Sequence, residues 1–229
     1  VSGDYSSLET YEKLGKSIEN IESGRCPEAG RVFYLSTPPD LCSQIVSLLG
    51  ASGLVSENYE GMPWRHVVIE KPFGHDLESA QKLDRELRSV LKERQIYRID
   101  HYLGKETVQN ILMLRFANRI FEPVWSHEHI ENVQITVAES VGVGHRAGYY
   151  EQSGQLRDMF QNHMLEMLSL VAMEMPVSFE ADSVRNEKAK LLQSIRPLPI
   201  KDLSSYIVRG QYAAANGLAG YTDEKGVAK

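Results

Sequence analysis

A dense group of chemically active side chains lies between residues 98 and 106. Asp100, His101, Tyr102 and Lys105 bring a carboxylate, an imidazole, a phenol and an ammonium group together within a few positions of the chain. A strand pattern ends just before this group, and a helix pattern begins just after it. Free N–H groups at a helix N-terminus, with His and Lys beside them, could hold a phosphate. A solvated loop with Tyr102 packed inward explains the same pattern equally well.

A second polar group interrupts an otherwise apolar helix pattern at residues 157–163. Asp158 and Asn162 are i,i+4 neighbours, and His163 follows directly at the margin of the apolar face. A partly buried imidazole tuned by a carboxylate could act as a general base near neutral pH. A histidine on a helix is more often structural, so the spacing alone leaves both interpretations open.

A third pattern, Gly142 to Ala147, satisfies the dinucleotide-loop spacing G-x-G-x-x-A. Its context argues against that function. The strand pattern before it alternates apolar and polar residues, and Gly148-Tyr149-Tyr150 delays the helix that should follow at once. We therefore expect a plain turn here.

The elements that position the first group alternate along residues 1–100. Helix patterns cover residues 7–23, 41–50 and 77–91, and short β-branched or aromatic runs cover 31–36, 66–70 and 96–99. Strands that alternate with helices of this length indicate an α/β fold, in which βαβ crossovers build a parallel sheet covered on both faces. Ser6 and Glu9 have the spacing of a capping box, Asp76 is the expected N-cap of the third helix, and Leu77 begins its apolar face.

Polar residues follow each of these three strands. They are Ser36-Thr37, Glu70-Lys71 and Asp100-His101. Because ligands of open parallel sheets bind at the carboxyl ends of the strands, these three stretches should share one rim.

The character of the chain changes near residue 101. We expect helices over 105–116, 155–173 and 184–195, and one half-buried strand at 133–137. These elements predict an α+β domain that starts near residue 101, with a Gly-rich tail after residue 217 that ends without a closing element.

Composition excludes several classes of protein. Of the 229 residues, 42% are hydrophobic and 24% charged, which is typical of globular proteins, and no apolar run is long enough for a membrane helix. The formal net charge of −6 argues against nucleic acid or an anionic membrane as a partner. Cys26 and Cys42 form no metal or disulfide motif, so we expect two buried thiols and no metal site.

Longer motifs contain the two polar groups described first. The run Arg98–Glu106, with Val108-Gln109-Asn110 and Arg115-Phe116-Ala117-Asn118 after it, resembles the signature of the glucose-6-phosphate dehydrogenase family. The resemblance extends over essentially the whole chain. Further motifs in the family's order are Glu70–Gly74, Arg157-Asp158, Gln161-Asn162-His163 and Gly210-Gln211-Tyr212.

The resemblance implies roles for particular residues. His163 would be the general base that removes the C1 hydroxyl proton of D-glucose 6-phosphate, and Asp100 would orient it. The pocket for the sugar phosphate would comprise His101, Tyr102 and Lys105, while Glu139 and Asp158 would accept hydrogen bonds from sugar hydroxyls. Lys71, aimed by a cis Pro72, would reach both substrate and the coenzyme NADP, and Ser36-Thr37 would lie against the coenzyme.

The resemblance also implies that this chain is the middle portion of an enzyme. Residues 1–100 would be the second half of a doubly wound, Rossmann-like sheet, and residues 101–229 the start of the α+β substrate domain. The family's Gly-rich fingerprint does not precede Val1, so NADP versus NAD preference cannot be read from these residues. The whole protein would be a cytoplasmic homo-oligomer, a dimer or tetramer. A non-catalytic phosphosugar-binding protein and an inactive truncated chain are the alternatives.

Overall fold

The computed structural model describes residues 1–24, 29–58, 60 and 62–228, so the expectation for Cys26 falls outside the described residues. The chain divides into two compact units, Val1–Asp100 and His101–Lys229. Among the described residues, no helix is both long and apolar enough to cross a membrane.

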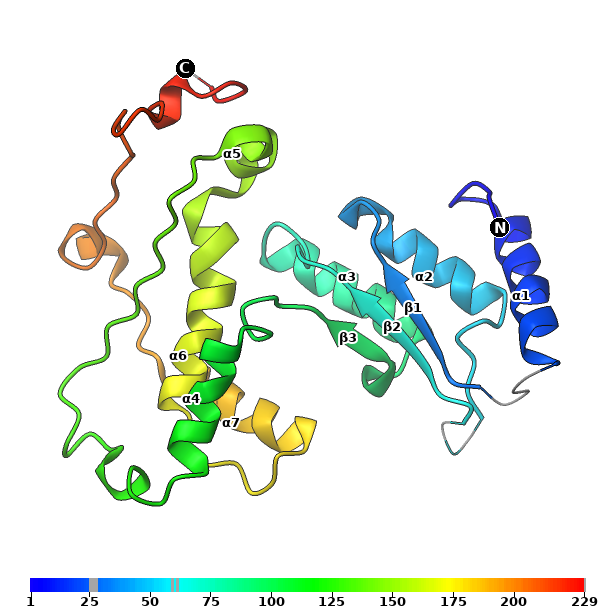
Figure 1. The fold of residues 1–229 in the computed structure, drawn as a ribbon, viewed down its shortest axis with the longest axis horizontal. Helices are drawn as coiled ribbons and strands as arrows, with labels where there is room; N and C mark the ends of the chain where they lie inside the picture. The colour runs from blue at the N-terminus through cyan, green and yellow to red at the C-terminus, as the bar shows by residue number, and fades with distance from the viewer. Residues whose placement is uncertain (25–28, 59, 61, 229) are drawn as a thin grey trace. The chain divides into compact units, whose positions relative to one another are not determined.

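The first unit is a three-stranded parallel sheet with helices between its strands (Figure 1). Its elements are α1 (Leu8–Glu22), β1 (Arg31–Leu35), α2 (Cys42–Ala51), β2 (Arg65–Ile69), α3 (Leu77–Val90) and β3 (Ile96–Arg98). The strands lie in the order β1-β2-β3, with Phe33 opposite Val67 and Val67 opposite Ile96. The predicted α/β fold with its parallel sheet is thus confirmed.

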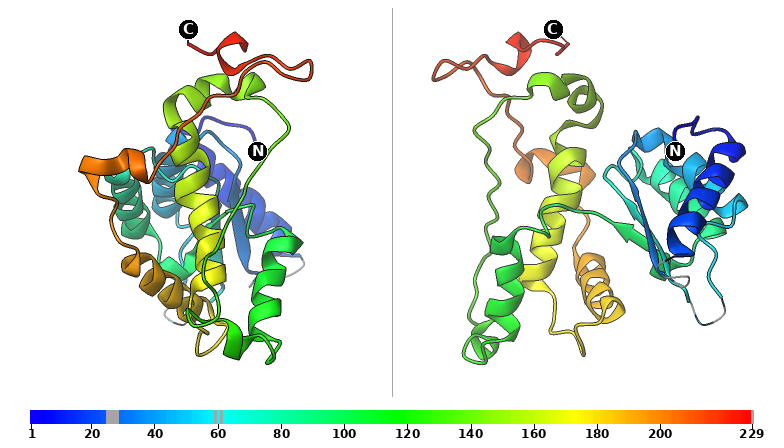
Figure 2. Two further views of the ribbon diagram at one scale, coloured as in Figure 1. Left: turned by 90° about the vertical axis from the view of Figure 1, so that its left-hand side faces the viewer. Right: turned by 45° about the vertical axis from the view of Figure 1, so that its right-hand side comes forward.

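The helices of this unit lie on one side of the sheet, as the second view in Figure 2 shows. Val67 and Ile69 of β2 point into the core with Ile45 and Leu49 of α2. On the other face Val32 and Tyr34 are each 55% exposed, so the expectation of a sheet covered on both faces is wrong for the described residues. The strand order explains why. Right-handed crossovers that advance in one direction place successive helices on the same face.

The N-cap predicted from the sequence is present at α3 but not at α1. Asp76 caps α3: its Oδ1 accepts from the Ser79 N–H at 2.8 Å, and the Ser79 side chain completes a capping box. Ser6 does not cap α1, which begins at Leu8, because its hydroxyl donates instead to Asp4 at 2.7 Å. Leu77 is 75% exposed and does not begin the buried face of α3.

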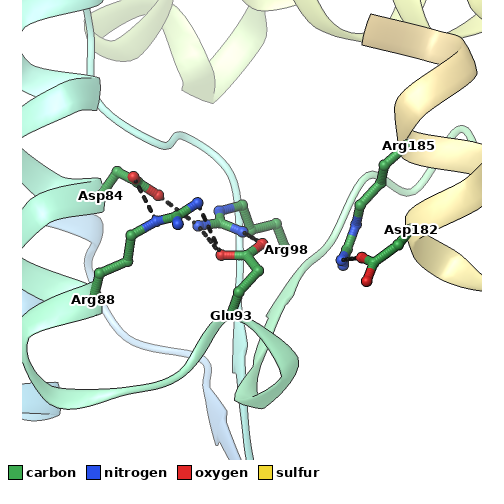
Figure 3. Close-up of polar contacts among 6 residues, drawn as sticks. All are labelled: Asp84, Arg88, Glu93, Arg98, Asp182 and Arg185. Carbon is green, nitrogen blue, oxygen red and sulfur yellow. Dashed lines mark hydrogen bonds and ion pairs between the residues drawn. The ribbon is translucent and has the colours of Figure 1, made fainter.

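Charged side chains join α3 to β3 (Figure 3). Arg98 contacts Asp84 and Glu93 at 2.8 Å each, and Arg88 contacts the same two carboxylates at 2.8 and 3.2 Å. Arg98 of the signature therefore anchors the strand that leads into residues 100–105. The other pair drawn, Arg185 with Asp182, links residues three apart on α7 at 3.1 Å.

The second unit is helical. Its helices are α4 (Glu106–Phe116), α5 (Ala147–Gln155), a π-helical segment (Leu156–Met164), α6 (Leu165–Ala172) and α7 (Ala181–Ser194), with short 3₁₀ turns at Gly144–Arg146, Ile200–Ser205 and Tyr221–Asp223. Val108 of α4 packs with Leu170 and Met173 at the end of α6. Arg115 is buried there and donates to the carbonyls of Leu170 at 2.6 Å and Met173 at 2.7 Å. It thereby satisfies carbonyl groups at the C-terminus of α6 and ties that helix to α4.

Three expectations for this unit are wrong. Residues 148–150 do not delay a helix, because α5 begins at Ala147. Residues 133–137 form no strand; the segment is the long trace that leads to α5 in Figure 1. A strand needs a hydrogen-bonded neighbour, and no strand of the second unit pairs with it among the described residues. The helix expected over 155–173 is also not one regular α-helix, because its first half is π-helical.

Candidate active site

Residues 101–105 form a tight turn that enters α4. The N–H of Gly104 donates to the His101 carbonyl at 3.2 Å, and the N–H of Lys105 donates to the Tyr102 carbonyl at 3.1 Å. Lys105 is the N-cap of α4, and its side chain makes no cap hydrogen bond, because an ammonium group cannot accept one. The first-turn N–H groups of α4 therefore have no side-chain cap and remain suited to an anion.

Tyr102 and His163 form the buried centre of the site. Tyr102 is 5% exposed and His163 is 1% exposed. Their rings stack with centroids 4.2 Å apart and planes 19° apart. His101, which is exposed, meets both rings edge-on, with centroids 4.7 Å from His163 and 4.9 Å from Tyr102. His101 and Tyr102 are neighbours in the sequence, whereas His163 lies more than 60 positions later. The fold thus brings His163 to the other two rings.

Two charged groups contact the Tyr102 side chain. The Lys105 ammonium lies 3.6 Å from the centre of the Tyr102 ring, within the range of a cation–π contact. The Tyr102 hydroxyl donates a long hydrogen bond of 3.4 Å to the carboxylate of Glu139, which is exposed. Tyr102 is packed inward, as the solvated-loop interpretation expected, while His101 and Lys105 remain exposed, as a phosphate site requires.

The π-helical segment decides which polar residues face inward. In an α-helix, residues five apart point about 140° away from each other. A π turn takes in one more residue, because its hydrogen bonds run from i to i+5, so residues five apart return to the same face. Asp158 (3% exposed) and His163 (1% exposed) are both buried for this reason. Their shared burial replaces the i,i+4 relation of Asp158 and Asn162 that the sequence suggested.

Asn162 instead supports the backbone of this segment. Its amide donates to the Arg157 carbonyl at 3.0 Å, and its carbonyl oxygen accepts from the His163 N–H at 2.7 Å. Arg157 is exposed and donates to the Gln152 carbonyl at 3.1 Å. Both residues therefore stabilise the irregular helix.

Tyr149 is a site residue that sequence reasoning missed. Its hydroxyl donates to the Asp158 carboxylate at 3.2 Å. Burial, followed by the negative charge of Asp158, raises the pKa of Tyr149, so the phenol is a protonated donor at neutral pH. The sequence carries no signal for this contact beyond a tyrosine near the glycines at 142–148.

The remaining predicted residues belong to the first unit. Thr37 is half-buried just beyond β1, and Lys71 is half-buried just beyond β2, where ligands of parallel sheets bind. The Lys71-Pro72 peptide is cis, as the resemblance implies. Asp100 is half-buried and ends the unit, directly before His101. The roles of these three residues remain predictions.

The described cysteine gives little support for thiol chemistry. Cys42 is buried, and burial raises the pKa of its thiol to about 11, so it is a poor nucleophile.

Two family models match the chain almost end to end. The model described as "Glucose-6-phosphate dehydrogenase, NAD binding domain" matches residues 1–110, and "Glucose-6-phosphate dehydrogenase, C-terminal domain" matches residues 112–229.

Individual relatives give the same result. Glucose-6-phosphate 1-dehydrogenase of Aggregatibacter actinomycetemcomitans is 48% identical, and the match covers 95% of this chain and 44% of that protein. The Bacillus subtilis protein of the same name is 45% identical, and the match covers 98% of this chain and 46% of that protein. A solved glucose-6-phosphate dehydrogenase in complex with its substrate glucose-6-phosphate superposes with a TM-score of 0.88 at 39% identity, covering 100% of this chain and 46% of that chain. A crystal structure of glucose-6-phosphate 1-dehydrogenase from Mycobacterium avium superposes with a TM-score of 0.82 at 38% identity, covering 99% of this chain and 45% of that chain. The chain therefore spans somewhat under half the length of the relatives it matches.

Proposed function

Because the chain belongs to the glucose-6-phosphate dehydrogenase family, we propose that the polypeptide carrying it oxidises D-glucose 6-phosphate at C1 with NADP as the coenzyme. The product is 6-phosphoglucono-1,5-lactone. The observation that carries this proposal is the stack of buried His163 on Tyr102, beside the uncapped, Lys105-flanked N-terminus of α4. It joins a base to an anion site within one small volume.

His163 is the general base of the proposed reaction. Its imidazole takes the proton of the C1 hydroxyl while the C1–H bond breaks and the carbonyl of the lactone forms. NADP+, when bound, accepts the hydride that leaves C1. Asp100 orients the imidazole and stabilises its protonated form. A general base of this kind contributes a factor of roughly 10²–10⁴ to the rate.

The phosphate of the substrate is held at the start of α4. The exposed side chains of His101 and Lys105 donate to it together with first-turn N–H groups. The carbonyl of Tyr102 stabilises the turn by accepting a hydrogen bond from the Lys105 N–H. Glu139 and Asp158 accept hydrogen bonds from sugar hydroxyls. Positioning the sugar at both ends lowers the entropy cost of bringing C1 to His163.

The first unit supplies the coenzyme side of the proposal. Thr37 and Lys71 follow the carboxyl ends of adjacent parallel strands, which is the position where such sheets bind nucleotides. We expect both residues to contact NADP, and the family resemblance implies a further contact of Lys71 with the substrate. On this view residues 1–100 are part of a dinucleotide-binding domain and residues 101–229 part of a substrate domain. By the family resemblance, the whole protein is a homo-oligomer of the cytoplasm.

The test is His163→Asn in the natural polypeptide that carries this sequence. We expect kcat to fall at least about a hundredfold and KM for glucose 6-phosphate to stay within a few-fold, because a base acts mainly in the transition state. Asp100→Asn should lower kcat less, since the imidazole remains. Exposed His127→Asn is the matched control and should change neither constant.

A near-normal kcat for His163→Asn would remove this residue from the mechanism. If the wild-type protein is protected by glucose 6-phosphate against thermal unfolding but never reduces NADP+, the non-catalytic phosphosugar-binding alternative is correct.

A further inference from the structure

Tyr149, on α5, contacts the buried carboxylate of Asp158, which belongs to the π-helical segment. The phenol Oη lies 3.2 Å from Oδ1 of Asp158, which is 3% exposed. An ionised carboxylate can only accept, so the phenol is the donor. Tyr149 itself is partly exposed, so its hydroxyl lies at the boundary between solvent and the buried interior.

The contact depends on a break in the helix at Gly154. Tyr149 and Asp158 are nine residues apart, which in a continuous α-helix would separate them by about 13 Å along the axis. Gly154 interrupts the helix with φ 64° and ψ 173°, a conformation that only glycine adopts readily. This break turns α5 out of line with the π-helical segment and so allows the Tyr149 hydroxyl to reach Asp158.

Two hydrogen bonds flank the break. The Ser153 hydroxyl donates to the Tyr149 carbonyl at 3.0 Å within α5, and the Tyr150 hydroxyl donates across Gly154 to the Gln155 side chain at 3.0 Å. The second of these bonds joins the two sides of the break near the Tyr149 phenol. Charged groups near this phenol are Asp158 and Arg146.

We infer that Tyr149 is a positioning residue that orients the Asp158 carboxylate for a hydroxyl of the sugar. The inference rests on the proposed function, in which Asp158 accepts a hydrogen bond from the substrate. By donating to one carboxylate oxygen, the phenol fixes the rotation of the group and directs its remaining lone pairs. Tyr149 touches neither substrate nor reacting atoms, and it acts through Asp158.

The experiment compares Tyr149→Phe with Tyr206→Phe in the natural polypeptide. Tyr149→Phe should raise KM for glucose 6-phosphate about tenfold and leave kcat within about threefold, because the Asp158 carboxylate loses the hydrogen bond that orients it for the sugar hydroxyl. Tyr206→Phe removes the hydroxyl of an exposed tyrosine outside the candidate site and should leave both constants near wild type. In the background of Asp158→Asn, the Tyr149→Phe change should have little further effect.

KM values for deoxy analogues of glucose 6-phosphate distinguish the positioning role of Tyr149 from a purely structural one. For the one analogue that lacks the hydroxyl bound by Asp158, wild type and Tyr149→Phe should have equal KM. A KM penalty that is equal for every analogue, or additive with Asp158→Asn, would overturn the inference. So would a Tyr149→Phe enzyme with wild-type constants. A wild-type protein without glucose 6-phosphate oxidation would instead overturn the proposed function.

Discussion

Tyr102 connects most of the groups at the candidate site through a single side chain. One face of its ring stacks on His163, the Lys105 ammonium lies 3.6 Å from the ring centre, and the hydroxyl reaches Glu139. A buried aromatic ring with a polar end suits this position because it packs without a charge of its own. The proposed base His163 and the proposed phosphate-binding residue Lys105 thus contact the same side chain.

Lys105 is the residue whose replacement should separate binding from chemistry. Lys105→Ala in the natural polypeptide should raise KM for glucose 6-phosphate by at least about tenfold and lower kcat only a few-fold, because a charged hydrogen bond to phosphate contributes about 1.5–3 kcal/mol. The effect on free glucose should be much smaller. Steady-state kinetics with both sugars checks this, with exposed Lys16→Ala as the control. Equal losses for both sugars would show that Lys105 does not face the phosphate.

At the scale of elements, the site depends on irregular helix geometry between α5 and α6. The π-helical segment turns Asp158 and His163 to the same buried face, and Arg115 holds the end of α6 against α4. In the proposed site, one helix therefore carries both the base and the acceptor for a sugar hydroxyl, and the N-terminus of α4 would bind the phosphate. Both helices are fixed by the core around Val108, Leu170 and Met173.

Changes of length in this segment should test the role of the π turns. Inserting one alanine after Gln161 places Asp158 and His163 six residues apart and on different faces, so kcat should fall at least about a hundredfold. Deleting Gln161 leaves them four apart, which an α-helix also places on one face, so most activity should remain. Gln161→Ala, which keeps the length, is the control. Kinetics and circular dichroism would measure the outcome, and equal damage from insertion and deletion would contradict it.

At the scale of the whole chain, the two units have separate cores, and the tail is fastened within the second. The core of the first unit gathers around β2, and that of the second around α4 and α6. The tail is held by Glu224, whose carboxylate accepts from the Val143 N–H at 2.9 Å and the Gly144 N–H at 2.6 Å, and also from the Tyr212 hydroxyl. The turn with dinucleotide-loop spacing therefore binds a carboxylate of its own chain.

This attachment should weaken in acid. The hydrogen bond from Tyr212, with those from the two backbone N–H groups, lowers the pKa of Glu224 below its ordinary 4.5. A group whose pKa is lowered by folding adds stability above about pH 4.5 and loses it as the pH falls through the folded value. Amide exchange at Val143 and Gly144, corrected for its intrinsic pH dependence, should therefore accelerate below that pH. Glu224→Gln should show the faster exchange already at pH 7, and a variant with wild-type protection would disprove the attachment.

Local patterns determined much of this protein from its sequence. The apolar run of β2, the cap at Asp76 and the alternation of helices with strands specify the parallel α/β unit, because each depends on residues within one or two turns of one another. The signature at residues 98–106 likewise located one wall of the site, since its residues lie at a single junction between strand and helix.

Contacts between distant residues were decided only by the tertiary structure. Residues 133–137 have a strand-like pattern, yet pairing needs a neighbour that local sequence does not provide. The open face of the sheet follows from the order of its strands, which periodicity along the chain does not specify. The shared burial of Asp158 and His163 follows from a π-helical segment, and the contact of Tyr149 with Asp158 follows from the helix break at Gly154. Sequence therefore specified the chemical groups and the local elements, and tertiary packing set the geometry in which those groups meet.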